Sequence, residues 1–120
     1  MYRFTCLLLV VAVITGCRKS GGDGFLKGKV IRISCASFVI QVIGPNIGEN
    51  NWKDIRSRND NVYNNVLNVT NYCTAIPTGV DEGNYIRFRI STDRPGCLSC
   101  YMYDAPPAVA YSLRDISLVE

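Results

Sequence analysis

The chain has 120 residues, 48% of them apolar, with 13 basic and 10 acidic residues, a formal net charge of +3, six cysteines and no histidine. This length suits one ordinary domain, and the weak, dispersed charge does not predict a nucleic-acid partner, which needs a concentrated basic face. The absence of histidine excludes Ser-His-Asp and Cys-His catalysis, histidine-ligated metal and a histidine pH switch within this chain.

The first sixteen residues have the pattern of a secretory signal peptide. Arg3 supplies one positive charge, and a largely apolar stretch runs from Phe4 to Gly16. Arg18 and Lys19 end that stretch short of the roughly 20 residues that a helix needs to cross a bilayer. We therefore expect residues 1–16 to be removed during export.

The apolar stretch ends in Ile14-Thr15-Gly16-Cys17, which resembles the lipobox of bacterial lipoproteins: a branched apolar residue, two small residues and the cysteine that receives lipid. The resemblance covers about the first 20 residues. It implies that the mature chain starts at Cys17, carries fatty acyl groups such as palmitate on its sulfur and amino nitrogen, and is held by them at a membrane. An ordinary signal peptide cut nearby and an uncleaved anchor are the alternatives.

The residue after the lipidated cysteine also bears on destination. In the lipoproteins that this chain resembles, aspartate at that position often retains the protein in the inner membrane. Arg18 stands there instead, which implies the outer membrane of the cell envelope, on either its periplasmic or its surface face. The sequence thus divides into a signal peptide (1–16), a lipidated cysteine with a polar, glycine-rich flexible tether (17–24), and one domain (25–120).

The domain is predicted to be all-β. Runs rich in β-branched residues at 29–34 and 37–43 indicate a hairpin, and 85–91 alternates strictly between apolar and polar residues. Residues 66–72 alternate less cleanly, and 111–119 forms a last strand with a bulge predicted near Arg114-Asp115. Between them, 50–58 is a candidate for one or two helical turns, although its asparagine-rich surroundings favour a long excursion between strands.

Five to six short strands without a long helical pattern favour a small antiparallel β-barrel of the OB type, with a β-sandwich as the alternative. Four cysteines remain in the domain: Cys35, Cys73, Cys97 and Cys100. In an oxidising compartment they are expected to form two disulfides, whose three possible pairings the sequence does not separate. The strand alternation predicts that Cys35, with Ile31 and Ile33, and Cys73, with Leu67 and Val69, point inward.

Cys97-Leu98-Ser99-Cys100 also has the spacing of a redox-active CxxC motif, so an envelope thiol-disulfide oxidoreductase is the alternative function. In thioredoxin-like enzymes the motif opens a helix that lowers the pKa of the first thiol. Here Pro106 and Pro107 would break such a helix within two turns. A four-cysteine zinc site lacks a second CxxC, so neither a metal nor a cofactor is predicted.

Nine of the ten asparagines lie between Asn46 and Asn71. Their amides, with nearby aromatic rings, suit recognition of a sugar or peptide, and they equally suit turns with left-handed backbone geometry. The possible binding surface comprises Trp52, Tyr63, Tyr72, Arg87 and Arg89. The function predicted is a lipid-anchored, non-enzymatic binding or structural module whose partner is an envelope protein or glycan, contacted chiefly through the 46–72 excursion.

Overall fold

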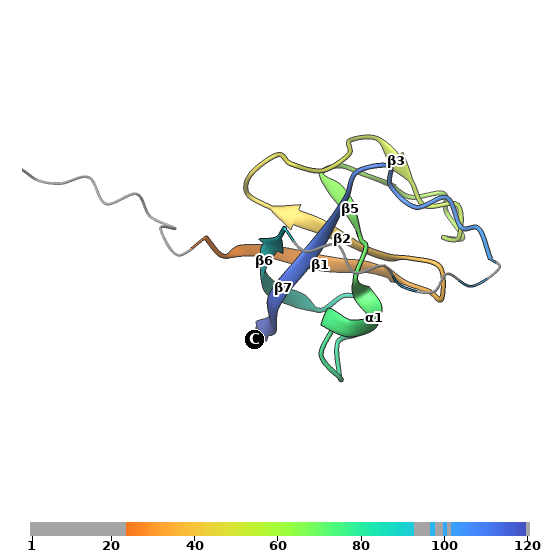
Figure 1. Ribbon diagram of the computed structural model, residues 1–120. Coiled ribbons are helices and arrows are strands. Elements are labelled where there is room, and N and C mark those ends of the chain that lie inside the picture. Colours follow the sequence, from red (N-terminus) through yellow and green to blue (C-terminus); the bar gives the residue numbers. More distant parts are fainter. Residues whose placement is uncertain (1–23, 93–96, 98–99, 101, 120) are drawn as a thin grey trace, which may run out of the picture.

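The computed structural model describes residues 24–92, 97, 100 and 102–119 (Figure 1). Almost all of its regular structure is strand. The elements, in chain order, are β1 (Leu26–Ile33), β2 (Phe38–Ile43), β3 (Trp52–Lys53), β4 (Val62–Tyr63), β5 (Val66–Val69), α1 (Tyr72–Ala75), β6 (Tyr85–Ser91) and β7 (Ala110–Val119).

Five strands form a closed barrel in the order β1-β2-β5-β7-β6, and β6 pairs with β1 to complete it. The barrel architecture predicted from the sequence is therefore confirmed over the sandwich. One contact departs from the expected antiparallel pattern, because β5 and β7 run parallel. The chain leaves β5 through α1 and continues into β6, which pairs with β1, and β7 then lies between β6 and β5 (Figure 1). This is the strand order of an OB-type barrel.

The β1–β2 hairpin is confirmed, but its inward face differs from the prediction. Pairing shifts between Val30 and Arg32, which leaves Ile31 as an extra residue on β1. The buried positions are Val30 and Arg32, whereas Ile33 is 39% exposed. Both faces of this strand carry branched apolar residues. Alternation alone therefore predicts that the face of Ile31 and Ile33, which has no arginine, is the buried one. The structure instead buries that arginine with acidic partners.

The predicted inward orientation of two cysteines is also wrong. Cys35 lies beyond the end of β1, and Cys73 lies on α1 rather than on an extension of β5; both are exposed. The alternation could not be carried past Val69 because the strand ends there and the chain turns into a helix. Leu67 and Val69 themselves are fully buried, as predicted.

The strand prediction at 85–91 matches β6 residue for residue. Ile86 and Phe88 are fully buried, while Tyr85 and Arg87 are exposed. The bulge predicted in the last strand is confirmed as well. Arg87 pairs with Ser117 and Arg89 with Arg114, so β7 carries an extra residue in this interval, and Asp115 has φ of 52°.

Residues 44–65 form a long excursion between β2 and β5 rather than a helix at 50–58. It ends earlier than the 46–72 predicted, because β5 begins at Val66. Its centre is a two-stranded sheet of β3 and β4. Asn51, Asp60 and Asn65 have φ of 57°, 48° and 57°, which confirms that asparagine and aspartate supply left-handed turns here. Gly48 passes so close to β5 that a Cβ atom would lie 2.6 Å from the backbone of Val66, so only glycine fits.

The side chain of Asn65 joins the start of the excursion to β5. Its oxygen accepts hydrogen bonds from the backbone amides of Ile47 (3.0 Å) and Gly48 (2.8 Å). Its amide nitrogen donates to the carbonyls of Val42 and Pro45, both at 2.9 Å. This amide therefore uses two donors and two acceptor contacts to hold a turn that has few backbone bonds of its own.

The main hydrophobic core fills the barrel interior. It comprises Val30, Phe38, Ile40, Val42, Leu67, Val69, Val80, Ile86, Phe88 and Leu113. A smaller cluster of Val39, Trp52 and Val66 lies between the barrel wall and the excursion. The second cluster is what gives the excursion an apolar attachment to the outside of β2 and β5.

Candidate binding site around Arg32

Arg32 is a cation buried at the end of β1, with only 3% of its surface exposed. Its Nη1 donates to Oδ1 of Asp54 at 2.8 Å, and its Nη2 lies 3.2 Å from Oδ1 of Asp104. Nη2 also donates to the hydroxyl of Ser37 at 3.0 Å. One guanidinium thus joins β1 to the excursion, which carries Asp54, and to the segment before β7, which carries Asp104.

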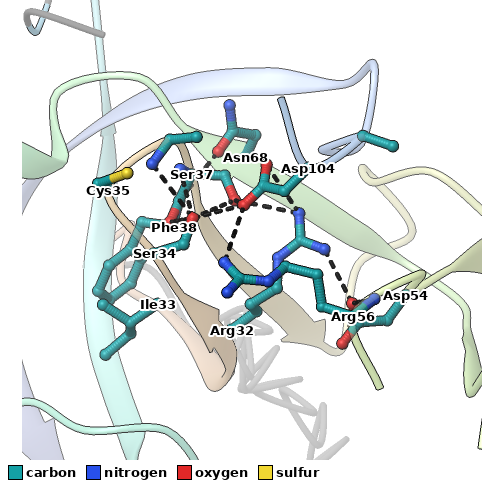
Figure 2. A network of polar contacts seen from close by, with 12 residues as sticks. Arg32, Ile33, Ser34, Cys35, Ser37, Phe38, Asp54, Arg56, Asn68 and Asp104 are labelled. Carbon is teal, nitrogen blue, oxygen red and sulfur yellow. Dashed lines mark hydrogen bonds and ion pairs between the residues drawn. The ribbon is translucent and has the colours of Figure 1, made fainter. Parts of the chain in front are cut away.

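Asp104 is the most enclosed carboxylate of this cluster, with 2% of its surface exposed. Its Oδ2 accepts hydrogen bonds from the hydroxyls of Ser34 and Ser37. Arg56 approaches the same oxygen with Nη1 at 3.8 Å. Figure 2 shows the carboxylate facing both guanidinium groups and both serines. We call Arg32, Ser34, Ser37, Asp54, Arg56 and Asp104 the Arg32 cluster.

The charges of the cluster balance: two arginines face two aspartates. Burial of these ions is tolerable because each has a partner of opposite sign. Nε of Arg32 and Oδ1 of Asp104 are nevertheless buried without a hydrogen-bond partner in the described part of the chain. The cluster therefore depends on its ion pairs, and loss of one partner leaves the other charge poorly compensated.

Trp52 covers the other side of the Arg32 guanidinium. The guanidinium carbon lies 4.9 Å from the ring centroid, and Trp52 Nε1 donates to the carbonyl of Ala105 at 3.0 Å. Tyr63 on β4 packs near the same indole, with ring centroids 6.2 Å apart. These contacts fix both the excursion and the 102–109 segment against the barrel, as Figure 1 shows where the blue segment lies beside β3.

A pocket of about 340 Å³ opens beside the cluster. Its wall combines two arginines, two carboxylates, two hydroxyl groups and two isoleucines, namely Ile31, Arg32, Ile33, Asp54, Arg56, Ser57, Tyr63 and Glu82. Arg56 is the accessible cation, since 44% of its side chain is exposed. Glu82 already accepts a bond from the backbone amide of Ile33 at 2.9 Å. The pocket wall offers donors, acceptors and the aromatic ring of Tyr63, without an excess of either charge.

The pocket wall offers groups that can hold a ligand. The hydroxyls of Ser34 and Ser37 are directed away from free solvent, since both donate to the Asp104 carboxylate, which also faces two arginines. Mixed donors and acceptors beside a ring and aliphatic side chains suit a polyhydroxyl or peptide ligand. Within the residues described, no three cysteine, aspartate or glutamate side chains gather to hold a metal ion.

The five residues predicted as a binding surface are not brought together. Tyr63 lines the pocket, whereas Trp52 does not and is only 6% exposed. Tyr72 lies on α1 and donates from its hydroxyl to the carbonyl of Cys35 at 2.7 Å. Arg87 and Arg89 lie on β6, where their guanidinium groups flank Phe25.

The Arg32 cluster was missed at the level of sequence. Arg32 offers the one sequence signal for this cluster, because it interrupts the apolar residues of 30–33. Asp54 and Asp104 sit in loops, and no periodicity connects them with β1. Their partnership with Arg32 depends on how the excursion and the 102–109 segment fold back over the barrel.

All four cysteines of the domain are disulfide-bonded, as expected. The pairs are Cys35–Cys100 and Cys73–Cys97, with sequence separations of 65 and 24 residues. Each cysteine of the CxxC motif is therefore bonded to a distant partner. The two bridges attach the segment before β7 to the end of β1 and to α1.

The lipidation site predicted at Cys17 lies outside the described residues. No helix in the part of the chain that the structure describes has the length and apolarity to span a bilayer. The sequence matches no protein-family model, and a search of curated proteins gave no match.

Proposed function

We propose that this protein is a lipid-anchored component of the bacterial cell envelope that binds an envelope protein or a glycan without catalysing a reaction. The lipobox-like sequence ending at Cys17 supports the anchor, and Arg18 directly after it supports the outer-membrane destination. The pocket beside the Arg32 cluster is the observation that carries the binding role. It lies where the excursion meets β1, so a ligand there contacts both the barrel and the excursion.

Rigidity of the excursion supports this role. Long surface segments usually bind well only when they are ordered in advance, because ordering on binding costs conformational entropy. Here Asp54 is fixed by Arg32, Asn65 fixes the first turn, and the side chain of Trp52 on β3 is buried. The pocket wall is thus formed before any ligand arrives.

The anchor is tested by metabolic labelling with a palmitate analogue in a bacterial host. Wild-type chain is expected to incorporate label and to fractionate with outer membranes, while Cys17→Ala incorporates none. Intact mass of the mature protein gives an independent readout, since it reports the acyl groups and the oxidation of the four remaining thiols together. An unlabelled wild-type chain that retains residues 1–16 would remove the anchor from the proposal.

The binding role is tested with two probes, detergent-solubilised envelope protein and purified cell-wall glycan. Arg56→Ala and Tyr63→Ala each remove a group from the pocket wall. We expect either change to weaken binding of the probe about tenfold, the scale of one lost hydrogen bond. Arg58→Ala is the matched control, because Arg58 is an exposed cation of the same excursion that does not line the pocket. Equal recovery with all three variants would place binding elsewhere, and failure of both probes would count against a binding module.

The disulfide pattern supports stapling rather than oxidoreductase chemistry for Cys97 and Cys100. An oxidoreductase would cycle between a dithiol and a disulfide within its CxxC motif. Thiol labelling after mild reduction separates the two roles: resistance of both bridges is expected, and a pair at 97 and 100 that opens and recloses readily would favour the enzyme.

A further inference from the structure

Five cations gather on the outer surface of three adjacent strands. They are Lys27 and Lys29 on β1, Arg87 and Arg89 on β6, and Arg114 on β7, and we call them the basic face. In β1 and β6 the buried side chains alternate with these residues, so the charged groups point away from the core. The fold thus concentrates charge that is dispersed along the sequence.

Like charges stand directly opposite one another on this face. Lys27 pairs with Arg87 across β1 and β6, and Arg89 pairs with Arg114 across β6 and β7. Side chains in such positions have Cβ atoms roughly 4.5–5.5 Å apart, and like charges there are destabilising. Asp115 partly compensates, lying 3.8 Å from both Arg89 and Arg114. Neither Lys27 nor Lys29 forms an ion pair within the part of the chain that the structure describes.

Two aromatic rings lie among these cations. The guanidinium carbons of Arg87 and Arg89 are 4.0 and 4.1 Å from the ring centroid of Phe25. Nζ of Lys27 and of Lys29 are 5.2 and 5.9 Å from the centroid of Tyr85. The exposed Tyr85 suits the boundary between lipid headgroups and water, where tyrosine and tryptophan are enriched.

The anchor places this face near a membrane. Only seven residues, 18–24, separate Cys17 from Phe25. Seven residues span at most roughly 25 Å. The first strand to follow the tether is β1, whose first half carries Lys27 and Lys29. The tether therefore leads directly into β1, the strand that carries two of the five cations of the basic face.

We infer that the basic face binds anionic phospholipid headgroups of the membrane that carries the anchor, and so orients the barrel on that membrane. The inference rests on the proposed lipid anchor for its location. The headgroup phosphates supply negative charge to Lys27 and Lys29 first, since these lie nearest the tether. Attraction of this kind adds about fivefold in affinity for each basic residue near the surface.

The test uses the mature chain, residues 17–120, with Cys17→Ser, so that binding reports the face and not the acyl groups. Phosphatidylcholine vesicles with and without phosphatidylglycerol are the probes in a sedimentation assay. Binding only to the anionic vesicles, and its loss as salt rises, is expected. Lys27→Glu with Lys29→Glu is expected to weaken binding at least about 25-fold.

The matched control is Lys53→Glu with Arg58→Glu, which makes the same change of net charge on the excursion, away from the basic face. It is expected to bind within about twofold of the Cys17→Ser parent. Folding is followed separately by urea unfolding. The face variant is expected to unfold no more easily, because the carboxylate introduced at position 27 would stand opposite Arg87.

Equal binding to both kinds of vesicle, or equal loss in the two double variants, would overturn the inference. Binding to a soluble anionic polysaccharide without binding to vesicles would overturn it too. Neither result touches palmitate labelling at Cys17 or probe recovery at the pocket. Failure of the basic face is therefore distinguishable from failure of the anchor or of the binding role.

Discussion

The two ends of β1 carry cations in opposite circumstances. Arg32, at the end of the strand, is buried and contacts the carboxylates of Asp54 and Asp104. Lys27 and Lys29, in the first half, point outward, and Lys27 stands opposite another cation on β6. The bulge at Ile31 lies between the two regions.

The difference shows the same charge used to stabilise the fold in one place and left exposed in another, where we propose that it binds headgroups. Around Arg32 the protein supplies its own counterions from two distant segments, so the cluster holds the fold of those segments together. On the basic face, Lys27 and Lys29 form no ion pair within the described residues, so we propose that their positive potential attracts a partner. Removing a charge should therefore destabilise the first region and, if anything, stabilise the second.

The largest effect is expected from Asp104→Ala. This change leaves Arg32 buried with one ion-pair partner fewer and removes the acceptor for Ser34 and Ser37. We expect the free energy of unfolding in urea to fall by about 3–5 kcal/mol. Asp81→Ala, at an exposed turn, is the control and should change it by less than about 0.5 kcal/mol. Equal effects of the two changes would mean that the cluster contributes nothing special to stability.

Removal of either disulfide tests how far the two bridges stabilise the fold and the segment that carries Asp104. Replacing Cys35 and Cys100 by serine opens a bridge with a separation of 65 residues, and replacing Cys73 and Cys97 opens one of 24. Each is expected to lower the free energy of unfolding by about 2–4 kcal/mol, and the first by about 1 kcal/mol more, since it closes the longer loop. The first also releases the chain just before Asp104. Thermal unfolding followed by circular dichroism measures both, and the reverse order would contradict the loop-length argument.

Asn65→Ala tests how much the first turn of the excursion contributes to stability and to the position of Asp54 beside Arg32. It removes four hydrogen bonds of one amide and places alanine at φ of 57°. We expect the free energy of unfolding to fall by about 2 kcal/mol, because the partly buried backbone groups that Asn65 bonds lose their hydrogen-bond partners. Asn59→Ala, exposed in the same excursion, is the comparison and should be close to neutral. Asn65→Ala should weaken binding at the pocket as well as stability, whereas Asn59→Ala should change neither.

Sequence could predict the elements whose pattern is local. Strict alternation with one apolar face gave β6 its bounds, and the change of phase near Asp115 revealed the bulge in β7. The inward face of β1 could not be obtained this way, because branched apolar residues occupy both faces and the decision depends on the acidic partners of Arg32. The disulfide pairing and the Arg32 cluster also join residues that lie far apart in the sequence. The cluster follows from the path of the 44–65 and 102–109 segments, and periodicity does not predict such a path.

The smallest expected effect lies on the basic face. Arg114→Thr removes the cation opposite Arg89 and leaves a residue that suits a strand. The free energy of unfolding should rise by about 0.2–1 kcal/mol at low salt, since a like-charge pair is lost. The gain should shrink as salt increases, because salt screens exposed charges. Urea unfolding at two salt concentrations measures it. A loss of stability that does not depend on salt would instead show that Arg114 stabilises β7 through Asp115, and the contrast between the two ends of β1 would not extend to this strand.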